Sequence, residues 1–206
     1  MSFDLERFDR AYYRRYYGVR PVHRPSDIAA LAQGVLGMCR WWGSNVRSVL
    51  DIGAGPGYWR DALPKGVRYQ GIDVSEHACA TYGHERRDIG TWSPKRPFDL
   101  VVAQGVLQYL DGPTCSRAIE HLSVATRAAL YLEVPTAHDR TDVLDGDRSD
   151  TTAYFRSGTW YRQRLGRHFV AAGAGLWLKP QIVRLYELEG GLRPAARPVR
   201  RDPASG

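Results

Sequence analysis

The stretch VLDIGAGPGYW, residues 49–59, holds the residues best suited to chemistry. Asp51 ends an apolar run, and three glycines follow it in a G-x-G-x-G pattern: Gly53, Gly55 and Gly57. Glycines here let the chain turn sharply and let a ligand approach backbone that a Cβ would block. The dinucleotide-binding pattern G-x-G-x-x-G needs a glycine where this chain has Tyr58, which disfavours a nicotinamide or flavin site.

Two more acidic residues end runs that resemble strands. Asp73 ends VRYQGID, 22 residues beyond Asp51, where a carboxylate can accept hydrogen bonds from both hydroxyls of a ribose. Asp88 and Ile89 end HERRDI, where a carboxylate and a backbone amide can meet the edge of an adenine. Ligands of open α/β sheets bind at the carboxyl ends of the strands, so these positions are expected to converge on one ligand.

Alternating strands and helices are expected to position these residues. Besides the runs above, FDLVVA and AALYLEV (128–134) predict buried strands, and helices are expected over 26–40, 58–63, 75–83, 105–110 continuing into 115–126, and 158–168. FVAAGAGLWL predicts a strand with a glycine kink or a hairpin, and IVRLYELE (182–189) a final strand. This alternation is typical of an α/β fold with a parallel sheet.

From VLDIGAGPG through GIDVS, RRDIG and FDLVVAQGVLQYL to ALYLEV, about residues 47–134, the sequence resembles the class I S-adenosylmethionine-dependent methyltransferases. It is similar to a small bacterial branch with no assigned substrate. The resemblance implies a Rossmann-like, seven-stranded, mostly parallel sheet with helices on both faces and an antiparallel carboxyl-terminal strand. It also implies a cofactor-binding set: Asp51, Gly53, Ala54, Gly55 and Gly57 around the methionine part, Asp73 and Val74 at the ribose, Asp88 and Ile89 at the adenine, and Gln104 and Gly105 beside the methionine end.

The methyl group on the sulfonium of such a cofactor is electrophilic without a metal. The protein must add in-line placement of a nucleophile and exclusion of water. Amino-methylating nucleic-acid enzymes of this fold share an Asn/Asp-Pro-Pro-aromatic motif where this chain reads AQGV, and it has no Pro-Cys pair of a cytosine C5 enzyme. We therefore expect a small-molecule acceptor, while methylation of an RNA ribose or ring nitrogen, and a non-catalytic cofactor-binding regulator, stay open as alternatives.

The segment after residue 134 holds candidates for acceptor contacts. Tyr154, Trp160 and Thr136 are candidate substrate or lid residues, with packing on the sheet as the alternative for the two aromatic residues. Candidate bases are Glu133, His138 and His168, although surface or structural roles are expected more often for histidines. The aspartates of this segment lack the regular spacing of a metal-binding loop, so we expect a solvated acidic loop and no metal: Asp142, Asp145, Asp147 and Asp150.

Near the amino terminus, RAYYRRYYGVR mixes tyrosines with arginines. On a helical wheel Tyr12 and Tyr16 fall on one side with Phe8, while Arg7, Arg10 and Arg14 fall opposite, joined by Tyr17. Asp9 lies among the aromatic residues, for which packing gives no reason. We expect a lid helix over the cofactor, with a purely structural helix and an RNA contact as alternatives.

Composition bounds the rest. The chain of 206 residues fits one domain, and its net charge of +7 is concentrated at its two ends. We expect a lid helix in residues 1–24, a methyltransferase domain in 25–190 and a flexible basic tail in 191–206. Three widely spaced cysteines indicate reduced thiols: Cys39, Cys79 and Cys115. Because the sequence shows no long apolar run, we expect no leader and a cytoplasmic location without membrane contact.

Overall fold

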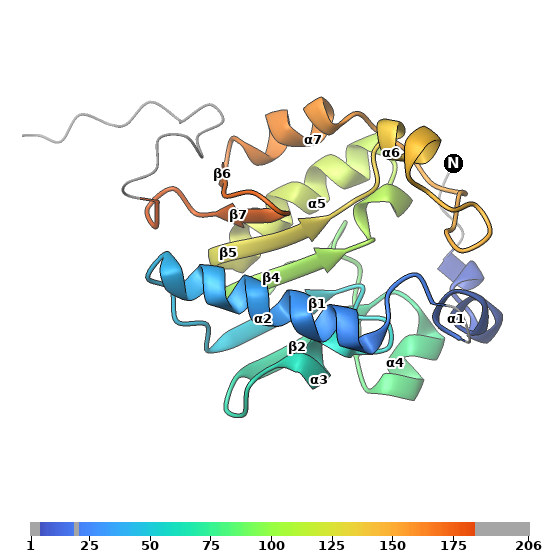
Figure 1. Cartoon of the computed structure of the whole chain (residues 1–206), viewed down its shortest axis with the longest axis horizontal. Helices are drawn as coiled ribbons and strands as arrows, with labels where there is room; N and C mark the ends of the chain where they lie inside the picture. The colour runs from blue at the N-terminus through green and yellow to red at the C-terminus, as the bar shows by residue number, and fades with distance from the viewer. Residues whose placement is uncertain (1–4, 19–20, 184–206) are drawn as a thin grey trace, which may run out of the picture.

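The computed structural model describes residues 5–18 and 21–183 (Figure 1). Most of the strand expected over 182–189 and the whole tail expected over 191–206 lie outside the described residues.

The described residues form one seven-stranded sheet in the order β3-β2-β1-β4-β5-β7-β6. Its strands are β1 (Ser48–Ile52), β2 (Arg68–Asp73), β3 (Glu85–Arg86), β4 (Phe98–Gln104), β5 (Thr126–Glu133), β6 (Val170–Ala171) and β7 (Leu176–Leu178). β7 runs antiparallel to both β5 and β6, whereas the other neighbouring strands pair in parallel. The predicted Rossmann-like fold with an antiparallel carboxyl-terminal strand is thereby confirmed.

Each central strand contributes side chains to two cores, one on each face of the sheet. In β4, Leu100 and Val102 pack with α2 (Pro25–Trp41) and α3 (Tyr58–Ala62), while Val101 and Ala103 pack with α5 (Gly112–Ala125) and α7 (Gly158–Leu165). Successive residues of a strand point to opposite faces, so a continuous apolar run fits a strand that is covered on both sides. Figure 1 shows α2 across one face and α5 and α7 on the other.

Two segments differ in detail from the sequence-based expectation. The helix expected from 105 onward is interrupted: a 3-10 turn, η2 (Leu107–Tyr109), ends before α5, whose first turn is capped by Asp111 and contains Pro113. The FVAAGAGLWL segment forms a hairpin, because Gly173 and Gly175 adopt left-handed conformations and turn β6 into β7. This hairpin supplies the last two of the seven strands.

The remaining helices are α4 (Glu76–Tyr82) and α6 (Ala137–Asp142), the second of which the sequence patterns did not predict. At the amino terminus a 3-10 turn, η1 (Leu5–Arg7), precedes α1 (Arg10–Tyr17). Asp9 is the N-cap of α1, since its side chain accepts the backbone N–H of Tyr12 at 2.9 Å. This cap explains why an acid sits among the aromatic residues. α1 lies at the end of the sheet toward which the parallel strands run (Figure 1).

Candidate functional site

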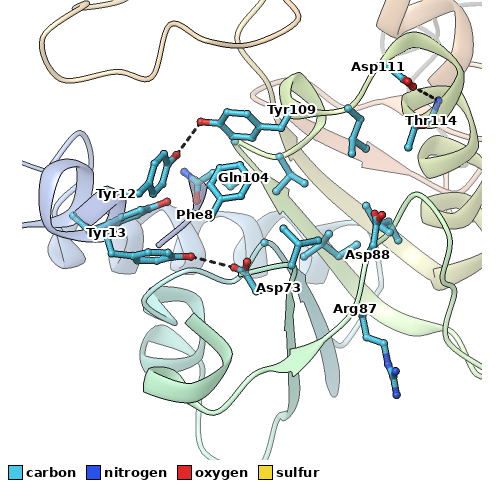
Figure 2. Close-up of a pocket in the computed structure, with 18 residues that line it drawn as sticks. Phe8, Tyr12, Tyr13, Asp73, Arg87, Asp88, Gln104, Tyr109, Asp111 and Thr114 are labelled. Atoms are coloured by element: carbon cyan, nitrogen blue, oxygen red, sulfur yellow. Dashed lines mark hydrogen bonds between the residues drawn. The ribbon is translucent and has the colours of Figure 1, made fainter. Parts of the chain in front are cut away.

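Two adjoining cavities lie at the carboxyl ends of the strands. The smaller has a volume of about 320 Å³ and the larger of about 570 Å³. Six residues line both cavities: Tyr12, Tyr17, Gly53, Gln104, Gly105 and Tyr109. Figure 2 shows the smaller cavity between the tyrosines of α1 and the Asp88 side of the sheet, with Arg87 directed away from it.

Most of the residues predicted to bind the cofactor line one or both of these cavities. Those at the smaller cavity are Gly53, Asp73, Val74, Asp88, Ile89, Gln104 and Gly105, and those at the larger include Asp51, Gly53, Ala54, Gly55, Gln104 and Gly105. Gly57 lines neither. It is the N-cap of α3 in a left-handed conformation, with φ of 82°, and so shapes the turn behind the cavities.

The loop after β1 requires glycine at two positions because the backbone there is left-handed, and at Gly53 also because a side chain has no room. Gly53 has a φ of +64°, and a Cβ placed on it would come within 2.5 Å of Cγ2 of Val106. Gly55 has a φ of +53°, and a Cβ placed on it would lie 3.6 Å from the Tyr17 hydroxyl, which is an ordinary contact. The backbone is thus left bare where the two cavities meet, which fits a ligand that must approach the chain closely.

Asp73 is the organising acid of the smaller cavity. It is 6% exposed, and its Oδ2 accepts the backbone N–H of Gly55 at 3.0 Å, while its Oδ1 accepts that of Ser75 at 2.9 Å. A third donor, the hydroxyl of Tyr13, reaches Oδ2 at 3.4 Å (Figure 2). A carboxylate offers about four acceptor positions. The long bond from Tyr13 is therefore the one that a ligand hydroxyl can replace at least cost.

Asp51 and Asp88 are held in different ways. Asp51 is 3% exposed, and burial raises its pKa to about 7 although Oδ2 accepts the hydroxyl of Tyr69 at 2.8 Å. Asp88 is half-buried, and its Oδ1 accepts the N–H of Gly90 at 2.7 Å. Asp88 and the neighbouring Ile89 lie on the wall of the smaller cavity opposite α1.

A chain of hydrogen bonds runs through the larger cavity at the ends of β4 and β5. Nε1 of Trp59 donates to Oε1 of Gln104 at 2.9 Å, and Nε2 of Gln104 donates to Oε2 of Glu133 at 3.1 Å. The hydroxyl of Tyr131 donates to the same Oε2 at 3.1 Å, and Nε2 of His23 lies 3.3 Å from Oε1. Gln104 and Glu133, which the sequence named separately, are thus neighbours in one network.

The amino-terminal segment forms the outer wall of both cavities. The hydroxyls of Tyr12 and Tyr109 are hydrogen-bonded at 2.9 Å across the junction (Figure 2), and Tyr16 lines the larger cavity. Ser75 fastens the segment further, since its hydroxyl donates to the carbonyl of Phe8 at 2.5 Å. Arg14 is exposed.

The helical wheel misplaced two residues of this segment. Tyr17, expected on the arginine side, stacks on Tyr13 at 5.2 Å and lines both cavities. Arg7, expected opposite the aromatic face of one continuous helix, lies in η1 before the helix begins and pairs with Asp150 at 2.5 Å. The side chain of Asp150 is only 4% exposed, so this ion pair ties the segment to the loop between α6 and α7.

Five other predicted residues lie outside the lining of both cavities. Thr136 caps α6, Trp160 packs against the core beneath the Arg164 guanidinium, and the backbone N–H of Tyr154 donates to the Gln108 carbonyl. His138 lies 3.3 Å from Asp142 on the exposed face of α6, and His168 lies 3.0 Å from Glu120.

Several lining residues were missed by the sequence reasoning. Tyr13 fell at the edge of the helical wheel, and Tyr109 was taken only as part of a helix. His23 lies between α1 and α2, where no periodic pattern marks it. In the part of the chain that the structure describes, no group of three or more potential metal ligands occurs, and no helix is long and apolar enough to cross a membrane.

Comparison with solved structures shows the same fold. The chain is 17% identical to the N-methyltransferase NodS from Bradyrhizobium japonicum WM9 in complex with S-adenosyl-L-homocysteine, with a TM-score of 0.58 over 84% of this chain and 98% of that one. It is 19% identical to the magnesium protoporphyrin IX methyltransferase ChlM from Synechocystis PCC 6803, with a TM-score of 0.54 over 82% and 90% of the chains.

A third similar structure is the sugar N-methyltransferase KedS8 from Streptoalloteichus, at 21% identity and a TM-score of 0.50. That match covers 60% of this chain and spans about half, 54%, of the length of KedS8. A search of curated proteins finds no significant match. The family model described as a methyltransferase domain matches residues 13–174, which is most of the chain. The chain therefore belongs to the methyltransferase domain family, and it has the fold of the solved methyltransferases named above.

Proposed function

We propose that the chain holds the adenosine part of S-adenosylmethionine in the smaller cavity and methylates a small molecule bound in the larger one. The methyl group is transferred to a nucleophilic oxygen, nitrogen or carbon by in-line displacement. The observation that carries this proposal is the junction of the two cavities at Gly53, Gln104 and Tyr109. Groups that meet at such a junction are held in reach of one another and away from bulk water, which is what in-line transfer needs.

In this arrangement the end of each of these strands binds one part of the cofactor. Asp73 and Val74 hold the ribose, and the carboxylate of Asp88 and the backbone amide of Ile89 meet the adenine edge. The methionine part lies along the bare backbone of the glycine loop, beside Asp51, and along Gln104 and Gly105. The bound cofactor supplies a sulfonium that makes its methyl group electrophilic. The residues of this chain bind and orient it.

Two of the named neighbours support a small-molecule acceptor. KedS8 acts on a sugar and ChlM on a magnesium protoporphyrin. The larger cavity, about 570 Å³ in volume, falls within the range of small-molecule pockets.

We further propose that residues 1–24 close over the cofactor as a lid on the methyltransferase domain of 25–190. Support comes from Tyr12, Tyr13 and Tyr17, which line the smaller cavity. The free cysteines Cys39, Cys79 and Cys115 support a cytoplasmic location.

Isothermal titration with S-adenosylmethionine tests the cofactor site. Binding that is unaffected by Asp73→Ala would contradict the residue assignment. Methyl transfer from labelled cofactor into a metabolite extract then tests the acceptor class and excludes a purely regulatory protein. Tight, salt-sensitive binding to tRNA or rRNA fragments that disappears when residues 191–206 are deleted would favour an RNA acceptor instead.

A further inference from the structure

The larger cavity contains a histidine whose tautomer is fixed by its partner. Nε2 of His23 lies 3.3 Å from Oε1 of Glu133, and both residues line the cavity. An ionised carboxylate only accepts hydrogen bonds, so the proton of the neutral imidazole resides on Nε2. Nδ1 then carries the available lone pair. His23 is thereby prepared to accept a proton.

Glu133 is fixed as the anionic partner of His23. Its other oxygen, Oε2, accepts from Gln104 and from Tyr131, both at 3.1 Å. Trp59 donates to the amide oxygen of Gln104 at 2.9 Å and so holds the amide with its NH₂ group toward Glu133. Burial works to raise the pKa of Glu133, but the hydrogen bonds from His23, Tyr131 and Gln104 outweigh it and hold the pKa below its usual value.

The charges on the cavity wall favour a cation. Asp150 is neutralised by Arg7, and burial raises the pKa of Asp51 to about 7, so neither contributes a full negative charge. The other acidic residues of the lining still exceed its single arginine: Glu133, Asp139 and Asp145 against Arg148. A positively charged acceptor is attracted to such a cavity and an anionic one is repelled.

A buried amide near the junction also lacks a partner. Gln108 is 6% exposed and lines the larger cavity, and its Oε1 makes no hydrogen bond to the residues that the structure describes. Leaving a buried acceptor unpaired costs about 1–3 kcal/mol. Recovering that cost requires the amide to turn its oxygen toward the cavity, where an N–H or O–H group of a ligand can donate to it.

From these observations we propose that the acceptor is an amine that enters as an ammonium ion, and that His23, held by Glu133, takes its proton. This inference rests on the proposed methyl transfer. The proton passes from the nitrogen to Nδ1 of His23. The freed lone pair forms the bond to the methyl carbon as the carbon–sulfur bond breaks, and that electron pair stays on the sulfur. Glu133 stabilises the imidazolium that results.

The surroundings of His23 agree with this role. The hydrogen bond to Glu133 raises the pKa of His23, with a smaller contribution from Asp27, while burial and Arg148 act to lower it. A raised pKa strengthens a general base, because the imidazole then binds the proton that it takes more tightly.

Matched acceptors test the substrate class. Methyl transfer from labelled cofactor is measured to 2-phenylethylamine against 2-phenylethanol and to glucosamine against glucose. We expect the amines to be methylated at least about tenfold faster than their alcohol partners, because the acidic cavity wall attracts the ammonium ion and has no such attraction for an alcohol. Faster methylation of the alcohols, or transfer to neither member of both pairs by a protein that binds the cofactor, would overturn the inference and leave cofactor binding intact.

Variants of the pair test the role of His23. For the better amine, His23→Gln should lower kcat by about 10²–10⁴-fold, the usual range for a general base, with unchanged affinity for the cofactor. His23→Gly should regain activity on addition of imidazole, a response that a structural role does not give. Glu133→Gln should move the acid limb of the kcat/KM profile to lower pH, because it removes the group that raises the pKa of His23.

A readout without cofactor completes the design. NMR titration of the imidazole resonances should show that the pKa of His23 falls in Glu133→Gln. Normal turnover and pH profile in His23→Gln, or loss of the acid limb in His138→Gln instead, would overturn the assignment. Failure of the wild-type protein to bind the cofactor would instead refute the proposed function on which it rests.

Discussion

The carboxylate of Asp73 accepts the backbone N–H of Gly55 at 3.0 Å. This bond joins the end of β2 to the glycine loop that follows β1. His84 holds the same residue from the other side, with Nε2 3.0 Å from the Gly55 carbonyl. A carbonyl only accepts, so His84 carries its proton on Nε2. The peptide groups on either side of Gly55 are therefore fixed before any ligand arrives, which is the preorganisation that binding requires.

Replacement of Asp73 should loosen both the loop and the cofactor. Asp73→Ala removes the acceptor of three hydrogen bonds, and each bond to a charged group contributes about 1.5–3 kcal/mol, so cofactor affinity should fall at least about tenfold. Isothermal titration measures the affinity, and the thermal midpoint shows whether the variant is folded. A folded variant with wild-type affinity would refute the role given to Asp73.

Tyr13→Phe, in contrast to Asp73→Ala, should not weaken the affinity for the cofactor. The ring is 7% exposed and stays packed, while the hydroxyl that occupies Oδ2 of Asp73 at 3.4 Å is removed. A ribose hydroxyl then meets no competitor, so cofactor affinity should be equal to or higher than that of the wild type. A clear loss of affinity, measured by the same titration, would mean that the Tyr13 hydroxyl itself contacts the cofactor.

Gly53→Ala should abolish cofactor binding. The new Cβ would lie 2.5 Å from Val106, and the left-handed φ of +64° costs a further 1–2 kcal/mol or so for an L-residue. Gly34→Ala is the matched control, because that glycine lies within α2 with nothing within 4 Å of the added Cβ and should gain about 0.5–1 kcal/mol. Denaturant unfolding and titration of both variants separate stability from binding.

Cofactor affinity should rise with pH up to about 7. Burial raises the pKa of Asp51 to about 7, so the carboxyl is largely protonated below that pH. The positive charges of the cofactor favour the ionised form, and binding should therefore release a proton. Below pH 7 the affinity should increase by up to about tenfold per pH unit and then level off. Asp51→Asn should remove this dependence, and a pH-independent wild-type affinity would contradict it.

Opposite faces of α1 should respond differently to substitution. Tyr12→Ala removes a wall of both cavities and the hydrogen bond to Tyr109, and Tyr16→Ala opens the larger cavity. Both should weaken cofactor affinity or turnover several-fold, since the site becomes open to water. Arg14→Ala changes an exposed residue of the same helix and should behave as the wild type. If cofactor affinity and turnover are the same in all three variants, α1 has only a packing role.

The sheet could be predicted because its signals are local. Residues 100–103 are an unbroken apolar run, and they form the middle of the central strand β4 (Phe98–Gln104), buried on both faces. The short strand β6 and the interruption before α5 depended on the conformations of Gly173 and on the cap at Asp111, which a periodic pattern does not reveal.

The site could be predicted where a strand end or the aromatic face of the amino-terminal helix supplied it. Asp51, Asp73 and Asp88 each lie at the end of a segment predicted as a strand, and parallel topology brings such ends together. His23 and Tyr109 lie on connections, where contacts across the fold and not the local sequence decide their positions. Asp9 is a local example of the same limit, because its role as an N-cap can be recognised only when the first residue of the helix is known.

The contacts that hold the amino-terminal segment in place also affect the rate at which the cofactor exchanges. Ser75 holds the carbonyl of Phe8, and Arg7 is bound to the buried Asp150, so two attachments keep the wall of the smaller cavity closed even where a ribose hydroxyl replaces the contact of Tyr13 with Asp73. A cofactor bound there exchanges only after these attachments open. We therefore expect the release of the spent cofactor, and not the chemical step, to limit the rate of successive rounds.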